Sequence, residues 1–418
     1  MIKEITLKNW KSFEDSSLYI DPVTAMIGPN ASGKSNALDA LSFLNRLASG
    51  VNITSILKGD GNITGLRGGL EWSCRKPGDT FTVGVLCDGG EGERTEYRYE
   101  ITVEVHDQQA LIKSESLLRI KYRPRTLKNP YKIWLFRTDG CGWEAPFITA
   151  RLYNEKQGKP FPSSRSNAIL FQLSTQKQRQ EIMIGVKQLV TDLANLFILD
   201  PIPSHMRDYK PLSDQLSSDA SNIAGVLAAL DVESKERIER VLSQYVKCLP
   251  EKDIVRVYAE KVGKFESDAM LYCDEYWGAG GEPHPVDARG LSDGTLRFLG
   301  ILTALLTRPV GSLLVVEEID NGLHPSRSSV LLKMLKDIGS VRKVDILFTT
   351  HNPALLDAMG PEMMPFITVS HRKDPGGFSQ LTLLEDLKQL PKLLAAGPIG
   401  KLSTEGRIEA ALKESGDE

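Results

Sequence analysis

The feature that most constrains this chain is the octapeptide GPNASGKS at residues 28–35, which fits the pattern G-x-x-x-x-G-K-[ST] at every fixed position. The apolar run before it, residues 23–27, is typical of a buried strand. After it, leucines recur at helical spacing at positions 38, 41, 44 and 47. A strand, a glycine-rich turn and a helix form a P-loop, whose N–H groups and positive helix end bind phosphate. A chance glycine-rich turn is the alternative, and the flanking strand and helix argue against it.

This motif predicts the chemistry of two side chains. Lys34 would reach the β- and γ-phosphates of ATP, and the hydroxyl of Ser35 would ligate Mg²⁺. A second apolar run, residues 313–316, ends in Glu317 and Glu318, as expected of a central parallel strand with acids at its carboxyl end. Glu317 would hold the Mg²⁺, and Glu318 would polarise the water that attacks the γ-phosphate. Two solvated acids at a strand end are the alternative.

Two further segments belong to the same set of candidates. The apolar strand 344–348 ends near His351, which could contact the γ-phosphate or be an ordinary structural histidine. The turn at Ser292, Asp293 and Gly294 opens an apolar helix over 296–306. The start of that helix is either a second anion site or simply an N-cap.

Composition and charge narrow the functional class. The chain has 418 residues, 41% hydrophobic and 25% charged, which is typical of a soluble globular protein with a sizeable core. The net charge of −3 gives no global basic field for nucleic acid. Five scattered cysteines without a C-x-x-C pair indicate neither a disulfide framework nor a zinc site, and a reducing cytoplasm fits. We find no signal-peptide core and no apolar run of membrane-spanning length.

Patterning along the chain predicts an α/β protein. Residues 2–8 and 18–20 are expected to be strands, and residues 70–147 an antiparallel meander of short strands separated by Gly/Asp turns. We expect a surface loop over 150–170, helices within 172–198, 221–230 and 233–249, and strands over 253–260 and 266–273. Helices and strands then alternate again up to about residue 370. The tail, residues 372–418, is interrupted by Pro and Gly and ends in a charged helix.

The order GPNASGKS, LSDGTLRFL, LLVVEEIDNGLHP and FTTHNP resembles the ABC-type ATPase head of the SMC/RecF/OLD group. It is most similar to compact bacterial AAA-family ATPases, OLD-like but without a Toprim domain, and the likeness covers most of the chain. The resemblance implies a P-loop NTPase fold, an ABC-type head with an antiparallel β meander and a helical insertion. As one head over 1–418, it would comprise a P-loop lobe (1–70), the meander (71–170), the insertion (171–285), a signature, Walker B and switch lobe (286–371) and a tail (372–418).

The resemblance also implies roles for matching positions. Glu317 would be the Walker B acid, with Ser35 a metal ligand; Glu318 the catalytic glutamate; and His351 the switch histidine, acting with Lys34. Ser292 to Gly294 would be the ABC signature and residues 320–323 the D-loop region, and Gln172 is one arbitrary choice for the Q-loop. Most ABC ATPases have Asp where this chain has Glu317. The residues expected to bind ATP are Gly28, Pro29, Asn30, Ala31, Ser32, Gly33, Lys34, Ser35, Asn36, Ser292, Asp293, Gly294 and, near the adenine, Lys11 and Phe13.

In such heads the signature serine contacts the γ-phosphate bound to a second head, so the resemblance implies an ATP-sandwiched homodimer or higher oligomer. The chain has no coiled-coil heptads, and only 67 residues (418 − 351) follow His351. That length is too short for the end of the head plus a Toprim domain, so intrinsic nuclease activity is not expected. A separate effector protein, such as a nuclease, is the expected partner.

One local feature could contact DNA. Arg119, Lys121, Arg123 and Arg125 alternate and would share a face of an extended strand, near Tyr122, Tyr131 and Trp134. The alternative is a solvated edge strand protected by charge.

Three functions remain open at this point. The first is an ATPase that controls an effector in anti-phage defence. The second is a RecF-like repair ATPase that acts on DNA directly, and the third is a low-turnover ATP-dependent scaffold or sensor.

Overall fold

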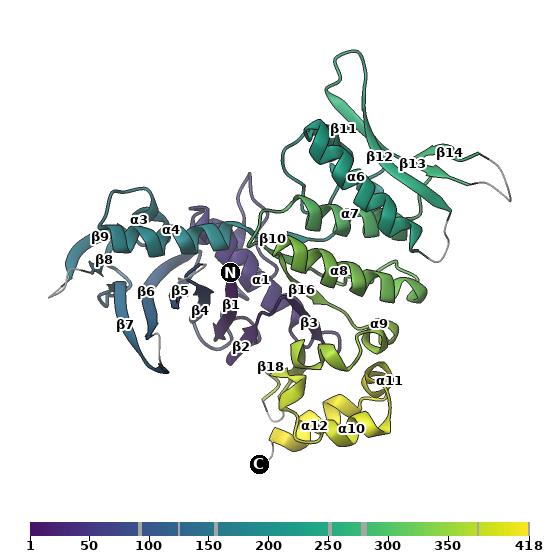
Figure 1. The fold of residues 1–418 in the computed structure, drawn as a ribbon. Coiled ribbons are helices and arrows are strands. Elements are labelled where there is room, and N and C mark those ends of the chain that lie inside the picture. Colours follow the sequence, from purple (N-terminus) through teal and green to yellow (C-terminus); the bar gives the residue numbers. More distant parts are fainter. Residues whose placement is uncertain are drawn as a thin grey trace.

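A six-stranded sheet forms the centre of the molecule in the computed structural model, which describes residues 1–90, 94–123, 126–153, 158–249, 253–276, 282–373 and 376–416 (Figure 1). Its order is β10 (Leu196–Leu199), β15 (Leu313–Val316), β16 (Asp345–Thr349), β3 (Val23–Ile27), β17 (Ile367–Arg372) and β18 (Ser379–Leu383). The first five strands run parallel, and β18 is antiparallel to β17. The strands predicted before the P-loop, before the paired acids and before His351 are therefore confirmed.

Hydrophobic cores cover both faces of this sheet. Every residue of β3, β15 and β16 is buried, as continuous apolar runs in parallel sheets require. Alternate side chains of β15 enter different cores: Leu314 and Val316 one, Leu313 and Val315 the other. Burial of each such side chain contributes roughly 1.5–3 kcal/mol. The predicted helices that follow the P-loop and the signature segment are α1 (Lys34–Ala48) and α7 (Asp293–Thr307).

The predicted meander is present as an eight-stranded antiparallel sheet. Its order is β2 (Asp15–Tyr19), β1 (Ile2–Lys8), β4 (Thr80–Asp88), β5 (Thr95–His106), β6 (Gln109–Arg123), β7 (Thr126–Thr138), β8 (Phe147–Leu152) and β9 (Lys159–Ser164). The surface loop expected over 150–170 is wrong, because this segment contains the end of β8, all of β9 and the start of α3. Ile148, Ala150 and Leu152 alternate inward on β8, and β9 pairs with β8 at the end of the sheet.

The region between residues 171 and 285 combines helices with strands, and the strands expected over 253–260 and 266–273 are present as β12 (Ile254–Val262) and β13 (Asp268–Glu275). It contains most of α3 (Ile169–Ser174), then α4 (Gln180–Ala194), α5 (Ile223–Ala229) and α6 (Val232–Lys247). The region also contains a small sheet, in the order β11 (Lys210–Pro211), β13 and β12. A further strand, β14 (His284–Asp287), pairs with β13. Figure 1 shows this small sheet with α6 at one side of the molecule and the antiparallel sheet with α3 and α4 at the other.

The remaining helices complete the two sides and the tail. They are α2 (Ile53–Lys58), α8 (Ser328–Arg342), α9 (Pro353–Ala358), α10 (Leu390–Ala396), α11 (Ile399–Thr404) and α12 (Arg407–Gly416). The last three gather beyond β18 (Figure 1). In the central sheet β16 lies between β3 and β15, so the P-loop, the paired acids and the end of β16 meet at the carboxyl edge of the strands.

Candidate functional site

The P-loop joins β3 to α1, and two of its glycines have backbone conformations that other residues rarely adopt. The φ angle is 137° at Gly28 and 118° at Gly33. A Cβ atom on Gly28 would lie 2.1 Å from the carbonyl oxygen of Ser370, and one on Gly33 would lie 2.5 Å from Oγ of Ser379. Both positions therefore require glycine, for the backbone angle and for space.

A pocket of about 290 Å³ lies beside this loop. It is lined by Asn30, Ala31, Gly33, Lys34, Ser35, Asn36, Glu317, Glu318, Thr349 and Arg372. Loop residues, both acids and the last residues of β16 and β17 thus share one cavity, although they come from four separate parts of the sequence.

Lys34 supplies a cation to this pocket. Its Nζ donates hydrogen bonds to the carbonyl oxygens of Gly28 and Pro29, at 2.7 and 3.0 Å. Burial lowers the pKa of Lys34, and the charges of Glu318 and Glu317 partly oppose that effect. An ammonium held against a glycine-rich turn is suited to binding phosphate oxygens.

The hydroxyl of Ser35 and the carboxylate of Glu317 meet directly. Ser35 Oγ donates to Oε1 of Glu317 at 2.5 Å, and Arg67 donates to both carboxylate oxygens at 3.1 and 3.2 Å. Burial opposes ionisation of Glu317, but the hydrogen bonds from Arg67 and Ser35 outweigh it and lower the pKa of this carboxyl. A hydroxyl beside an ionised carboxylate is a hard oxygen donor set, which fits Mg²⁺.

Glu318 lines the pocket from a constrained backbone. Its φ angle is 48°, in the left-handed region, and its N–H donates to Oγ1 of Thr349 at 2.8 Å. Arg297, buried in α7, donates to the carbonyl oxygens of Glu317 and Glu318, at 3.1 Å each. Such a conformation persists where its surroundings hold it, so the backbone of Glu318 is fixed beside the pocket.

A family model described as "AAA domain, putative AbiEii toxin, Type IV TA system" matches residues 23–357, from β3 through the P-loop and both acids to α9. The chain belongs to this AAA-domain family. The P-loop ATPase assignment made from the sequence is thereby confirmed.

Relatives of this AAA-domain protein include chromosome partition proteins. The protein Smc of Mycobacterium tuberculosis is 26% identical over 288 residues, which are 65% of this chain and 21% of the relative. Smc of Methanococcus voltae is 54% identical over 44 residues, 10% of this chain and 4% of the relative. The chain therefore spans a quarter or less of these relatives. Their likeness and the family match confirm the resemblance at the level of the SMC/ABC-type ATPase group.

Solved SMC heads are similar over nearly the whole chain. A SmcHead bound to the C-winged helix domain of ScpA is 14% identical with a TM-score of 0.49, covering 91% of this chain and 97% of its own. An Smc head domain with an extended coiled coil, bound to the C-terminal domain of ScpA derived from Pyrococcus furiosus, is 13% identical with a TM-score of 0.48, covering 94% and 99%.

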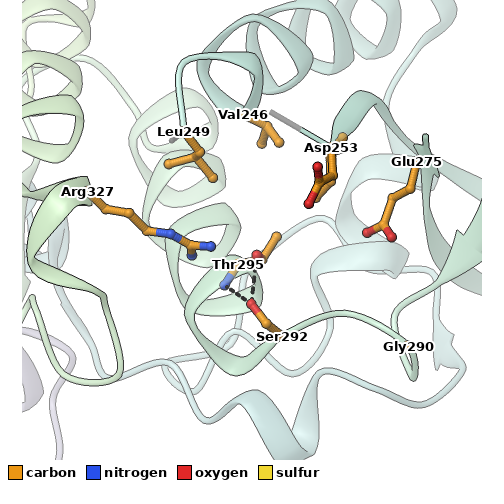
Figure 2. Close-up of a pocket in the computed structure, with 9 residues that line it drawn as sticks. Val246, Leu249, Asp253, Glu275, Gly290, Ser292, Thr295 and Arg327 are labelled. Carbon is orange, nitrogen blue, oxygen red and sulfur yellow. Dashed lines mark hydrogen bonds between the residues drawn. The ribbon is translucent and has the colours of Figure 1, made fainter. Parts of the chain in front are cut away.

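In this AAA-domain protein Ser292, part of the predicted signature, lines a second pocket, of about 400 Å³ (Figure 2). That pocket is lined by Val246, Leu249, Asp253, Ile254, Glu275, Gly290, Ser292, Thr295 and Arg327. Ser292 is the N-cap of α7, because its Oγ accepts a hydrogen bond from the N–H of Thr295 at 3.1 Å. The N-cap predicted as the alternative is therefore present. Figure 2 shows Arg327 reaching toward Thr295 from one side while Asp253 and Glu275 lie on the other. Among the described residues, none lines both this pocket and the P-loop pocket.

Arg207 holds the loop at residues 288–291, which precedes the predicted signature. Its Nη1 donates to the carbonyl oxygens of Ala288, Arg289 and Leu291, at 3.1, 2.9 and 2.7 Å. Its Nη2 donates to Oδ1 of Asp293 at 2.5 Å. One guanidinium therefore joins the segment after β10 to the start of α7.

The structure does not bring every expected site residue to a pocket. Phe13 is fully buried in the core, Lys11 pairs with Asp39, and neither lines the P-loop pocket. Their contact with adenine stays a prediction. His351 is exposed after β16 and lines neither pocket described above. Gln172 bonds instead to main-chain groups of residues 164 and 167, which gives it a local structural role.

Three arginines at the site, at positions 67, 207 and 297, were missed from the sequence. Two of them act on residues far away in the chain: Arg67 and Glu317 are 250 positions apart, and Arg207 and Asp293 are 86. Arg297 and Glu317 are 20 positions apart. Arg207 and Arg297 lie inside segments that carry the family resemblance, DPIPSHMRDY and LSDGTLRFL, and this was the available signal.

The basic strand predicted as a DNA contact is only partly described. Arg119 is 18% exposed and lies 3.7 Å from Glu181 of α4, while Lys121 is exposed. The Arg123 side chain and Arg125 lie outside the described residues. Within the part of the chain that the structure describes, no helix has the length and apolar character to cross a membrane.

Proposed function

We propose that this chain binds and hydrolyses ATP with Mg²⁺, and that ATP joins the P-loop of one copy to the signature segment of a second. The observation that carries the proposal is the division of the motifs between two pockets. Lys34, Ser35 and both acids share one, whereas Ser292 lines the other. In this proposal each pocket is one half of an ATP site, so a second copy is needed to close either of them.

Each residue near the P-loop would have a distinct task. Lys34 and the N–H groups of the loop would bind the β- and γ-phosphates, and Ser35 with Glu317 would hold Mg²⁺. Bound there, Mg²⁺ would neutralise charge on phosphate oxygens. Glu318 would orient the attacking water and accept its proton, and His351 would contact the γ-phosphate.

The test compares ATP-dependent assembly of two variants. Glu318→Gln keeps the side-chain size but removes the base, so it should bind ATP, fail to turn it over and accumulate as a dimer. Lys34→Ala should neither bind ATP nor dimerise. Light scattering after gel filtration, with and without Mg-ATP, measures both effects. A Glu318→Gln protein that is saturated with ATP yet remains a monomer would contradict an ATP site shared between two copies.

We further propose that assembly of the heads controls a separate effector protein in anti-phage defence, in the cytoplasm. The family description, which names a toxin of a type IV toxin–antitoxin system, supports an antagonistic role. The effector should bind wild-type protein and the Glu318→Gln variant with different affinities in ATP. Binding that ignores the nucleotide would count against control by assembly.

A RecF-like role on DNA is the second candidate, supported by the relatives named as chromosome partition proteins. DNA-stimulated ATP turnover by the purified chain, without a partner, would favour it. Strong ATP-dependent assembly with negligible turnover would favour a scaffold or sensor.

A further inference from the structure

Three side chains that carry metal-binding atoms meet on the antiparallel sheet. Asp79 precedes β4, and Glu104 and His106 lie near the end of β5. Nε2 of His106 is 3.6 Å from Oδ2 of Asp79 and 3.4 Å from Oε1 of Glu104, and the ligand atoms of all three lie within 4.8 Å of one another. This cluster is separate from the pocket at the P-loop, with which it shares no residue.

The sheet itself produces this meeting. Thr80 of β4 pairs with Glu104 of β5, so Asp79 lies beside the last residues of β5. The N–H of Val105 donates to the carbonyl oxygen of Asp79 at 2.8 Å, which holds the two segments together. Residues 104 and 106 are two apart on an extended strand and point to the same face.

The spacing fits a small divalent cation. Around Zn²⁺, with ligands at about 2.0–2.2 Å in a tetrahedron, neighbouring ligand atoms lie about 3.3–3.6 Å apart. The two distances from His106 already have that size. One imidazole and two carboxylates form a donor set that Zn²⁺ accepts, with water completing the coordination.

Neighbouring residues hold two of the ligands in place. Nη2 of Arg165 lies 3.7 Å from Oε2 of Glu104, which leaves Oε1 on the side of His106. The ring of His106 packs edge-on against Trp143, with centroids 4.4 Å apart. Arg165 in turn donates to the carbonyl oxygens of Gly142, Trp143 and Ala145, so the loop carrying Trp143 is fixed too. Outer groups of this kind orient metal ligands.

Lys113 is the competitor at this cluster. Its Nζ lies 3.4 Å from the same Oε1 of Glu104 that a metal would use. The Lys113 side chain is 46% exposed and can swing into water at little cost. A metal ion would therefore displace Lys113, whereas Arg165 on the other carboxylate oxygen would stay.

We propose that Asp79, Glu104 and His106 form a Zn²⁺-class site that joins the start of β4, the end of β5 and the Trp143 loop. The site is structural and is independent of the ATP-binding residues. Its occupancy would stabilise the antiparallel sheet rather than change the chemistry at the P-loop.

Titration calorimetry with ZnCl₂ on the full chain, in excess Mg²⁺, tests this site. We expect one saturable event that His106→Ala and Asp79→Asn each weaken at least tenfold. Lys113→Ala should strengthen it several-fold, because it removes the competing cation. Asp79→Asn keeps the experiment decisive if His106→Ala misfolds, since the Asp79 side chain is 57% exposed. The matched control is His205→Ala, at an exposed histidine paired with Asp219, which should leave Zn²⁺ affinity unchanged.

A second measurement distinguishes this ligand set from the free cysteines. Co²⁺ bound at Asp79, Glu104 and His106 should show visible absorption without an intense near-ultraviolet thiolate band. The proposal is overturned if no saturable Zn²⁺ binding occurs, if the His106 and Asp79 variants bind like the wild type, or if a thiolate band appears. The cluster would then be a set of polar contacts among three side chains that holds no metal.

Discussion

The buried carboxyl group of Glu115 should make the stability of this protein depend on pH. Glu115 lies on β6 and is 1% exposed. Its Oε2 accepts from the N–H of Ile169 at 2.7 Å, and its Oε1 from the N–H of Leu170 at 2.8 Å and the hydroxyl of Tyr99 at 3.0 Å. The side chain thereby connects β6 to the first turn of α3.

Burial decides the sign of the effect. It raises the pKa of Glu115 from 4.5 to about 7, and the three hydrogen bonds oppose it only in part. The folded chain then holds this proton more tightly than the unfolded chain. The stabilisation is therefore fully present below pH 4.5 and is lost as the pH rises through 7. A difference of about 2.5 pKa units (7 − 4.5), at 1.36 kcal/mol each, amounts to roughly 3 kcal/mol.

The substitution Glu115→Gln isolates this contribution. Glutamine cannot ionise and offers one acceptor oxygen instead of two, so we expect it to destabilise by about 1–3 kcal/mol at pH 5. Between pH 5 and pH 8 the stability advantage of the wild type over this variant should fall by roughly 2–3 kcal/mol. Urea denaturation at several pH values measures it, with Glu236→Gln at an exposed position on α6 as the control. An advantage that stays constant or grows with pH would refute the reasoning, because the three donors would then hold the carboxylate ionised.

Three other substitutions test the P-loop pocket. Arg297→Met removes the donor to the carbonyl oxygens of Glu317 and Glu318. The free energy of unfolding should therefore fall by about 2–3 kcal/mol, and ATP turnover should be lost. Unchanged turnover would contradict the role of this contact. Arg67→Ala removes both arginine hydrogen bonds that lower the pKa of Glu317, so the acid limb of the pH–rate profile for ATP hydrolysis should move to higher pH. A limb that stays in place would show that another group controls it. Gly33→Ala puts a Cβ 2.5 Å from Oγ of Ser379, at a residue whose φ is 118°. The affinity for a fluorescent ATP analogue should therefore drop at least tenfold, while the circular dichroism spectrum stays unchanged. An affinity equal to that of the wild type would contradict this.

Local sequence patterns were sufficient to predict those parts of the site that are built from contiguous residues. The strand, loop and helix from β3 to α1 are contiguous, and β15 carries its acids directly after its last residue. Their patterns therefore predicted both the elements and the pocket that Lys34 and Glu317 share. The contribution of Arg67 could not be predicted in this way, because Arg67 and Glu317 are 250 positions apart and meet only in the tertiary structure.

Strand β9 illustrates a different limit. Its sequence, KPFPSS, contains two prolines and few apolar residues, which indicates a loop. It nevertheless forms a strand because it lies at the end of the sheet and pairs with β8 alone. An edge strand tolerates proline, since one row of its N–H groups has no ladder to join. The position of a strand in its sheet is a tertiary property that local sequence does not contain.

Three side chains at the P-loop pocket are already bonded to protein groups, and this limits what a single copy can gain from nucleotide at those positions. Lys34 bonds to loop carbonyls, Ser35 bonds to Glu317, and Arg67 spans Glu317 and Asp39. For these side chains ATP and Mg²⁺ would replace existing bonds, so each exchange would contribute only about 0.5–1.5 kcal/mol. If Ser292 of a second copy supplies the rest, the apparent affinity for ATP must rise with protein concentration, because ATP and assembly are linked. An affinity independent of protein concentration would instead mean that one copy binds ATP with all the contacts it uses.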